Sequence, residues 1–374
     1  MKILYVTTIS NTINAFLIAH IKSLVDQGHE VDIACNIVRE IDAKIVELGC
    51  EIHNVEFQRS PLKKDNYKAY MKIQKIIKKE RYELIHTHTP IASFLVRLAC
   101  KSFNIEVLYT AHGFHFMKGA PLKNWLLYYP MEMLAARWTD GIITINEEDY
   151  YLAKKLKLRK FDSVYKVNGV GIDMNKYRPA SNTEKHELRR KYGYKDDDFL
   201  LIYAAELNNN KHQDLLISAI NILKDRIPNL KLLLAGVGTL EGKYRNQVNN
   251  LRITQYVDFL GDCKDVQKLL RISDIGVSSS KREGLPVNVM EAMATGLPLV
   301  VTDCRGNRDL VHDGENGYVV GVDDLEGYAQ VIEKLYKSKE LRKEFGSKSL
   351  QLVKNYSLEN VIKKMDEIYY HYLK

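Results

Sequence analysis

The chain has 374 residues, a length that suits two domains and is too great for one ordinary core. Its 45% hydrophobic and 27% charged residues are ordinary values for a globular enzyme. No apolar run approaches the length of a membrane span, and five scattered cysteines without a CxxC pair argue against a disulfide framework and a structural zinc site. The start, MKILYVTTIS, predicts a strand instead of a signal peptide, so we expect a cytoplasmic protein.

Short apolar runs alternate with longer amphipathic stretches through the first half of the chain. Helices are expected near 15–27, 40–49, 59–81 and 121–138. Strands separated by helices predict a parallel sheet that is covered on both faces. The expected strands are KILYVTT (2–8), EVDIACN (30–36), ELIHTHT (83–89), VLYTAHG (107–113) and GIITIN (141–146).

A second series of the same kind follows the Gly- and Pro-bearing stretch VNGVGIDMNKYRPA (167–180), which predicts the domain boundary. The fold class is therefore α/β, with two Rossmann-like doubly wound parallel-sheet domains facing across a cleft. Ligands of such sheets bind at the carboxyl ends of the strands. The expected strands are FLLIYAAE (199–206), KLLLAG (231–236), YVDFLG (256–261), IGVSSS (275–280) and LPLVVTD (297–303).

The net charge of +8 lies mostly in residues 1–170 and is densest in 59–81. A solvated basic helix, with Tyr70, Ile73 and Ile77 packed inward, explains this density. Docking on anionic lipid headgroups explains it equally well. Nucleic acid is less favoured, because no recognised binding motif accompanies the charge.

The stretch SSSKREGLPVNVMEAMATG (278–296) predicts a strand end, a turn and a helix that begins after Pro286. Free amides at a helix start bind phosphate. Glu283 lies on the turn and Glu291 in the helix, and a carboxylate can accept hydrogen bonds from two neighbouring hydroxyls. Two carboxylates around a phosphate site favour a nucleotide-sugar ligand.

The segment EGLPVNVME resembles the E-x7-E motif of the retaining GT-B fold glycosyltransferases of family four. The similarity is specific through 257–320 and extends to VNGVGIDMNKY, IHTHTP and YTAHGF, so it covers most of the chain. It implies a GT-B fold with an acceptor-binding domain (1–170), a nucleotide-sugar-binding domain (171–355) and a last helix (356–374) that crosses back to the first domain.

The resemblance also implies roles for single residues. Glu291 would bind the ribose hydroxyls, Glu283 the donor sugar, and the amides of Val287 and Asn288 the distal phosphate. Lys211 matches a lysine that stabilises the leaving diphosphate, where negative charge accumulates in the transition state. His112 matches a first-domain histidine that approaches the donor sugar. The catalytic set is thus His112, Lys211 and Glu283, and the donor-binding set is Gly238, Glu283, Gly284, Leu285, Val287, Asn288, Glu291 and Lys211.

One position departs from the family. An arginine usually stands five residues before the lysine, whereas this chain has Glu206. A carboxylate beside a diphosphate is unfavourable, so Arg282 or Arg305 is expected to supply the missing charge. The Glu-Leu pair at this position is similar to the capsule and exopolysaccharide branch of the family, which includes EpsD- and CapM-like enzymes.

Other stretches carry weaker signals. The acceptor side is expected to include Ser10, Asn11, Thr12 and His115, which follow first-domain strands. The triplet Asp196–Asp198 predicts a turn before a strand, and no cluster has the character of a metal site. His86 and His88 are expected to be structural. The stretch 121–134 is typical of a core helix, with a membrane-edge contact as the alternative.

The sequence therefore predicts a retaining, metal-independent hexosyl- or N-acetylhexosaminyltransferase without a cofactor. Its donor is expected to be a UDP-sugar, and its acceptor a sugar on a polyprenyl diphosphate in surface polysaccharide assembly. It is expected on the inner face of the cell membrane, held through its first domain. A nucleotide-sugar 2-epimerase and a non-catalytic membrane-associated partner subunit are the alternatives, and donor turnover would separate these last two.

Overall fold

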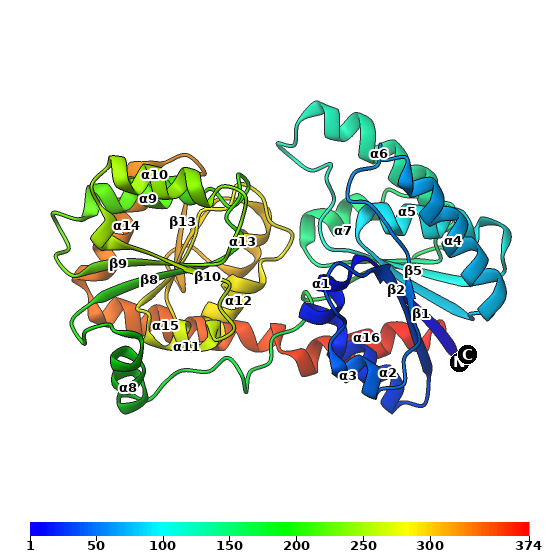
Figure 1. Ribbon diagram of the computed structural model, residues 1–374, viewed down its shortest axis with the longest axis horizontal. Coiled ribbons are helices and arrows are strands. Elements are labelled where there is room, and N and C mark those ends of the chain that lie inside the picture. Colours follow the sequence, from blue (N-terminus) through cyan, green and yellow to red (C-terminus); the bar gives the residue numbers. More distant parts are fainter. Residues whose placement is uncertain (374) are drawn as a thin grey trace. The chain divides into compact units, whose positions relative to one another are not determined.

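The computed structural model describes residues 1–373 and divides into two compact units. Unit 1 comprises residues 1–170 together with the chain from Val361 onward, and unit 2 comprises residues 171–360 (Figure 1). Each unit is a parallel sheet with helices packed on it, so the expected α/β fold with two Rossmann-like domains is confirmed.

Unit 1 holds a seven-stranded sheet in the order β3-β2-β1-β4-β5-β6-β7. Its strands are β1 (Lys2–Ile9), β2 (Glu30–Asn36), β3 (Ile52–Asn54), β4 (Leu84–His88), β5 (Glu106–Ala111), β6 (Gly141–Thr144) and β7 (Val164–Lys166). Its helices are α1 (Ser10–Thr12), η1 (Ile13–Leu17), α2 (Ile18–Asp26), α3 (Ala43–Glu47), α4 (Asp65–Glu80), α5 (Pro90–Ala99), η2 (Cys100–Ser102), α6 (Leu122–Ala136) and α7 (Glu147–Ala153).

Unit 2 holds a six-stranded sheet in the order β10-β9-β8-β11-β12-β13. Its strands are β8 (Phe199–Ala204), β9 (Leu230–Ala235), β10 (Val257–Gly261), β11 (Ile275–Ser278), β12 (Leu299–Thr302) and β13 (Gly317–Val320). Its helices are α8 (Asn182–Tyr192), α9 (Gln213–Leu223), α10 (Glu241–Asn250), η3 (Thr254–Tyr256), α11 (Val266–Ile272), α12 (Val287–Ala294), α13 (Arg305–Leu310), α14 (Leu325–Lys337), α15 (Lys339–Val353) and η4 (Lys354–Tyr356); α16 (Leu358–Tyr370) begins here and continues into unit 1.

The strand order reverses once in each sheet. In unit 1, β1 lies between β2 and β4, and in unit 2, β8 lies between β9 and β11. Loops that leave neighbouring strands on opposite sides of such a reversal open a crevice at the carboxyl edge of the sheet. The loops that follow β1, β4, β8 and β11, which contain residues with predicted chemical roles, therefore emerge at the crevice of their own unit.

The ten expected strands are present, whereas β3, β7 and β13 were missed. These three lie at sheet edges and contain three or four residues each. An edge strand is covered on fewer sides than a central one, so it needs no continuous apolar run for the sequence to reveal.

The two helices singled out in unit 1 differ from each other. In α4, Ile73 and Ile77 are buried and Tyr70 packs against the same core, as the spacing predicted. The core-helix interpretation of 121–134 holds for one face only: Trp125, Tyr128 and Tyr129 of α6 pack against a buried cluster, whereas Leu122 and Leu126 are 73% and 71% exposed. The apolar pattern of the sequence cannot show which apolar face of a helix a neighbour covers.

Residues 356–360 stay with unit 2 because the chain forms a short parallel bridge there. The amide of Ile172 donates to the carbonyl of Tyr356 at 2.9 Å, and the amide of Leu358 donates to the carbonyl of Ile172 at 2.9 Å. Gly171 has φ +84°, and a Cβ on it would lie 2.7 Å from the Cα of Leu358. The bridge therefore requires glycine at this position.

Replacing Gly171 by alanine is expected to lower the melting temperature more than replacing Gly28 does. Gly28 has φ +85° with no atom near its Cβ position, so both variants acquire left-handed strain and only Gly171→Ala adds a backbone clash. The extra loss should be roughly 1–3 kcal/mol. Thermal unfolding of both variants tests this, and equal losses would contradict the close approach.

Candidate functional site

In unit 2, a lysine and a glutamate meet at the carboxyl ends of β8 and β11. The Nζ of Lys211 lies 2.6 Å from Oε1 of Glu283, and the two side chains are only 20% and 12% exposed. Burial by itself lowers the pKa of the Lys211 ammonium, but attraction to the Glu283 carboxylate outweighs it and raises this pKa. Lys211 is therefore a cation at neutral pH.

The loops that carry this pair are fastened to each other. The Oδ1 of Asn208 accepts hydrogen bonds from the amides of Asn210 and Lys211, each at 3.0 Å, which fixes a tight turn before α9. The amide of Lys281 donates to the carbonyl of Asn210 at 2.8 Å, and Nδ2 of Asn210 donates to the carbonyl of Arg282 at 2.9 Å. The position of Lys211 relative to Glu283 is thus set by backbone contacts.

Helix α12 begins directly after this loop. Pro286 precedes it in an extended conformation, so the amides of Val287 and Asn288 form the first turn. Leu285 is buried, and Gly306 of α13 packs so close to Gly284 that a Cβ would lie 2.5 Å from the carbonyl oxygen of Gly284. The loop and the start of α12 are therefore held against α13.

Glu291 lies just over one turn into α12. Burial raises the pKa of Glu291 to about 7, and a hydrogen bond from Tyr177 and the charge of Lys176 offset part of this effect. Tyr177 is itself buried, and burial together with the neighbouring Glu291 carboxylate raises its own pKa. Tyr177 was not predicted as a site residue, because a lone aromatic residue in a segment between two domains usually has only a packing role.

The structure also shows the positions of Glu206, the residue that departs from the family pattern, and of the two arginines expected to compensate for it. Glu206 is exposed, and its carbonyl accepts a hydrogen bond from Nε2 of Gln213 at 3.0 Å. Arg305 is buried at the start of α13, and its Nε donates to the carbonyl of Glu283 at 2.8 Å. Arg282 is partly exposed on the loop before Glu283. Arg305 thus brings positive charge against the Glu283 loop.

The loop after β9 lies against the loop after β8. A Cβ on Gly238 would lie 2.2 Å from the carbonyl oxygen of Leu207, and one on Gly236 would lie 2.1 Å from that of Ala205. Both glycines are therefore required by backbone contact. Gly238 joins the same edge of the sheet as Lys211.

In unit 1, three buried or half-buried histidines, His86, His88 and His112, gather near the ends of β4 and β5. The Nε2 of His112 lies 3.0 Å from Nδ1 of His88, while Nδ1 of His86 lies 2.6 Å from the hydroxyl of Tyr369 in α16. Burial, with the charge of His20, lowers the pKa of His112 to about 4. His112 is therefore a neutral hydrogen-bonding group at neutral pH. Its contact with His88 was not predicted.

Unit 1 also contains a cavity of about 270 Å³ at the ends of β1 and β4. Two of the residues expected on the acceptor side, Thr12 and His115, line it, and the rings of His115 and Tyr128 lie 4.5 Å apart. Ser10 does not, because it is fully buried and its hydroxyl bonds to the backbone of Arg39. Asn11 is absent from the lining too. Arg59, Thr89 and Tyr128 were not predicted there.

The triplet 196–198 lies before β8, at the amino end of the strand. Oδ2 of Asp198 accepts from the amide of Lys195 at 2.8 Å, and Oδ1 of Asp196 lies 2.6 Å from Nδ1 of His186. These are the contacts of a turn and of a surface hydrogen bond. The triplet therefore lies at the opposite edge of the sheet from Lys211.

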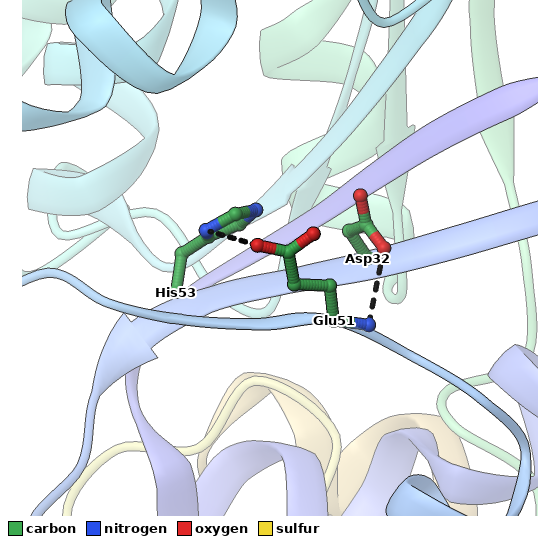
Figure 2. Close-up of side chains that lie close together, drawn as sticks. All are labelled: Asp32, Glu51 and His53. Atoms are coloured by element: carbon green, nitrogen blue, oxygen red, sulfur yellow. Dashed lines mark hydrogen bonds and ion pairs between the residues drawn. The ribbon is translucent and has the colours of Figure 1, made fainter. Parts of the chain in front are cut away.

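One group of potential metal ligands occurs among residues 1–373, formed by Asp32, Glu51 and His53 (Figure 2). Nδ1 of His53 lies 3.7 Å from Oε1 of Glu51, and the amide of Glu51 donates to Oδ1 of Asp32. The Asp32 carboxylate already accepts a hydrogen bond from Tyr82 and lies 3.4 Å from the ammonium of Lys2. Its charge is thus balanced by protein groups.

Two doubly wound units, one of them carrying a helix start flanked by two glutamates and a lysine, define a sugar transferase of the GT-B class. The model of the family described as glycosyl transferases group 1 matches residues 184–351, and that described as glycosyl transferase 4-like matches residues 2–146. The chain belongs to this glycosyltransferase family, and within it to the EpsD- and CapM-like branch.

The chain is 40% identical to EpsD of Bacillus subtilis, which is named as a glycosyltransferase, over all of this chain and 97% of that protein. It is 26% identical, over 80% of this chain and 78% of the relative, to the UDP-Gal:alpha-D-GlcNAc-diphosphoundecaprenol alpha-1,3-galactosyltransferase of Escherichia coli. Among solved structures, Anabaena HepE in complex with UDP and glucose matches with a TM-score of 0.81 at 19% identity, covering 98% of each chain.

The raised pKa of Glu291 predicts a pH-dependent effect of its replacement. Because its folded-state pKa of about 7 lies above the ordinary value of 4.5, the native protein loses stability as pH rises from below 4.5 to above 7. Glu291→Gln should therefore melt at a higher temperature than the wild type at pH 8, with little difference at pH 4.5.

Glu315→Gln is the control, since Lys348 lowers the pKa of this exposed carboxyl and the variant should show no gain at pH 8. The test compares melting curves of the wild type, Glu291→Gln and Glu315→Gln at the two pH values. An equal gain for Glu291→Gln at both pH values would contradict a buried, titrating carboxylate.

Proposed function

We propose that the protein is a retaining glycosyltransferase that moves a sugar from a UDP-sugar to a sugar on a membrane-bound polyprenyl diphosphate, in surface polysaccharide assembly. The observation that carries this proposal is the largely buried Lys211–Glu283 pair at the switch point of unit 2, on the loops that lead to α9 and to α12, the helix that contains Glu291. The printed names of the relatives support the two substrates: one names UDP-galactose and a diphosphoundecaprenol-linked sugar, and the HepE structure contains UDP.

The donor diphosphate is proposed to bind between the first amides of α12 and the Lys211 ammonium. Both offer positive charge, and a helix start with free N–H groups is a common anion site. Without a donor, the Lys211 cation is neutralised by Glu283. A bound diphosphate would share Lys211, which frees Glu283 to accept hydrogen bonds from sugar hydroxyls. Arg305, held against the Glu283 loop, is proposed to supply the charge that Glu206 lacks.

Glu291 is proposed to bind the ribose. Two vicinal hydroxyls donate best to an ionised carboxylate. Because the pKa of Glu291 is about 7 in the empty protein, ribose binding would favour loss of its proton. Tyr177, which hydrogen-bonds with Glu291, would keep the carboxylate directed toward the ligand.

In the proposed reaction, the bond between the anomeric carbon and the phosphate oxygen breaks while the acceptor oxygen attacks from the same face. The acceptor proton passes to a phosphate oxygen of the departing UDP, so no protein nucleophile is required. Lys211 and the α12 amides stabilise the charge that develops on UDP, and this stabilisation needs no metal ion. For His112 we propose a neutral hydrogen bond to a sugar hydroxyl.

The acceptor is proposed to occupy the cavity of unit 1. The His115 and Tyr128 rings offer an aromatic surface for a sugar, the hydroxyls of Thr12 and Thr89 offer hydrogen bonds, and Arg59 offers positive charge for a diphosphate. We also propose that unit 1 contacts an anionic membrane surface, since most of the positive charge lies there.

UDP should raise the melting temperature of the wild type, and GDP and ADP should raise it less. A ligand that binds only the folded state stabilises it by mass action, by about 2.7 kcal/mol at one hundred times its Kd. Glu291→Ala should lose most of the UDP shift and should no longer distinguish UDP from 2′-deoxy-UDP.

The exposed Glu315 gives the matched control, since Glu315→Ala should retain the full shift. Thermal-shift measurements at pH 8 provide the comparison, because Glu291 is then ionised in the wild type. Absence of a shift with every nucleotide at millimolar concentration would overturn the proposed donor site.

Lys211→Ala should lower the turnover of the UDP-sugar identified in this way by roughly 10–150-fold, the equivalent of one charged hydrogen bond of 1.5–3 kcal/mol in the transition state. Lys281→Ala, which removes an exposed cation from the neighbouring loop, should leave turnover nearly unchanged. The measurement is the rate of UDP release with an acceptor-bearing membrane extract. Equal rates for the two variants would exclude a role for Lys211 in stabilising the leaving group.

A further inference from the structure

Helix α6 presents a nearly continuous apolar surface to solvent. Its exposed large apolar side chains are Leu122, Leu126, Leu127, Met133 and Leu134, with exposures from 38% to 73%. At 100° per residue, these five positions fall within an arc of about 140° on one side of the helix. Pro130 lies in the same arc and is exposed as well. Exposed apolar side chains grouped on one side of a helix indicate a contact with an apolar partner.

The opposite side of α6 is firmly attached to unit 1, so the exposed arc is not free to turn inward. The guanidinium of Arg97 bonds to both carboxylate oxygens of Glu132, at 2.5 and 3.1 Å, and both side chains are buried. Arg97 also lies over the ring of Tyr109, and Ala135 and Ala136 are fully buried. The orientation of the leucines is therefore set by buried contacts on the other face.

The charges on the exposed side are all positive. Lys123 and Arg137 flank the leucines within and just after the helix, and Lys118 is exposed before it. The helix contains one acidic residue, Glu132, and that residue is buried. Apolar and basic side chains on one arc, without an exposed carboxylate, complement the surface of a bilayer that contains anionic lipids.

The length of α6 indicates how it could meet such a bilayer. Its 15 residues span about 22 Å, less than the roughly 30 Å of a hydrocarbon core. Among residues 1–373, no helix is both long and apolar enough to cross a membrane. A helix with these properties lies in the plane of the interface.

We propose that α6 is the element that inserts into the membrane, with Leu122 and Leu126 among the acyl chains and its basic residues at the headgroups. This inference names the element by which the proposed transferase would reach a lipid-linked acceptor, and it rests on the proposed function. Tyr128, on the same helix, lines the cavity assigned to the acceptor. Insertion of α6 thus brings that cavity to the level at which a lipid-linked sugar is presented.

Helix α4 is the competing surface, and it provides a matched control. It exposes Tyr67 and Met71, which are four residues apart like Leu122 and Leu126, but its surroundings are dense in lysine. A helix of this kind attracts anionic lipid mainly by charge, so its contribution should fall with salt. Apolar insertion through α6 should persist at high salt.

The test is sedimentation of the full-length protein with vesicles of phosphatidylcholine containing roughly 30% phosphatidylglycerol, at about 0.1 and 0.5 M salt. The wild type should bind at both. Leu122→Ser with Leu126→Ser should lower the partition coefficient roughly tenfold or more at both salt concentrations, because two apolar side chains are lost. Tyr67→Ser with Met71→Ser should stay within about threefold of the wild type.

Each variant is also tested for its UDP thermal shift without lipid, which reports the donor site in unit 2 separately. A retained shift with lost vesicle binding in the α6 variant supports the inference. Unchanged binding of the α6 variant, or an equal loss in the α4 variant, overturns it and leaves the donor proposal standing. A lipid-independent dimer of the wild type that becomes monomeric in the α6 variant would assign the surface to a second copy and overturn it too.

Discussion

Parallel pairing of the strands is the constraint on which the rest of the structure depends. A parallel ladder requires a crossover between successive strands, so every loop after a strand emerges at the same edge of its sheet. In unit 2, this brings Lys211, which follows β8, to Glu283, which follows β11, although 72 residues separate them. In unit 1, the same rule brings Thr12 and His115 to one cavity.

The charges at the switch point of unit 2 add little to the stability of the fold. The Lys211–Glu283 pair is largely buried, and burying an ion pair adds little net stability because both groups lose water. The ionised Glu291 carboxylate makes the folded state less stable, since burial raises the pKa of this group to about 7. Groups held in such an environment cluster at functional sites, where a ligand supplies the missing partners.

Unit 1 uses a different chemistry. His86 and His112 are neutral, because burial lowers the pKa of His112 to about 4 and that of His86 to about 3, so these two residues offer directed hydrogen bonds without charge. Its positive charge is carried on helix surfaces, where α4 exposes lysines and α6 exposes leucines beside basic residues. An acceptor that joins a sugar, a diphosphate and a lipid would need all three of these properties.

The sequence by itself determined the central strands, the two-unit α/β architecture and the location of the EGLPVNVME loop, because apolar periodicity and a Gly-Leu-Pro turn before a helix are local properties. Only the tertiary structure decided which side chains meet. The bond between Tyr177 and Glu291, the contact of His88 with His112 and the burial of Ser10 against Arg39 join residues that are far apart in the chain. The exposure of the α6 leucines was likewise undecidable, since an apolar helix has the same sequence whether a neighbour covers it or a membrane does.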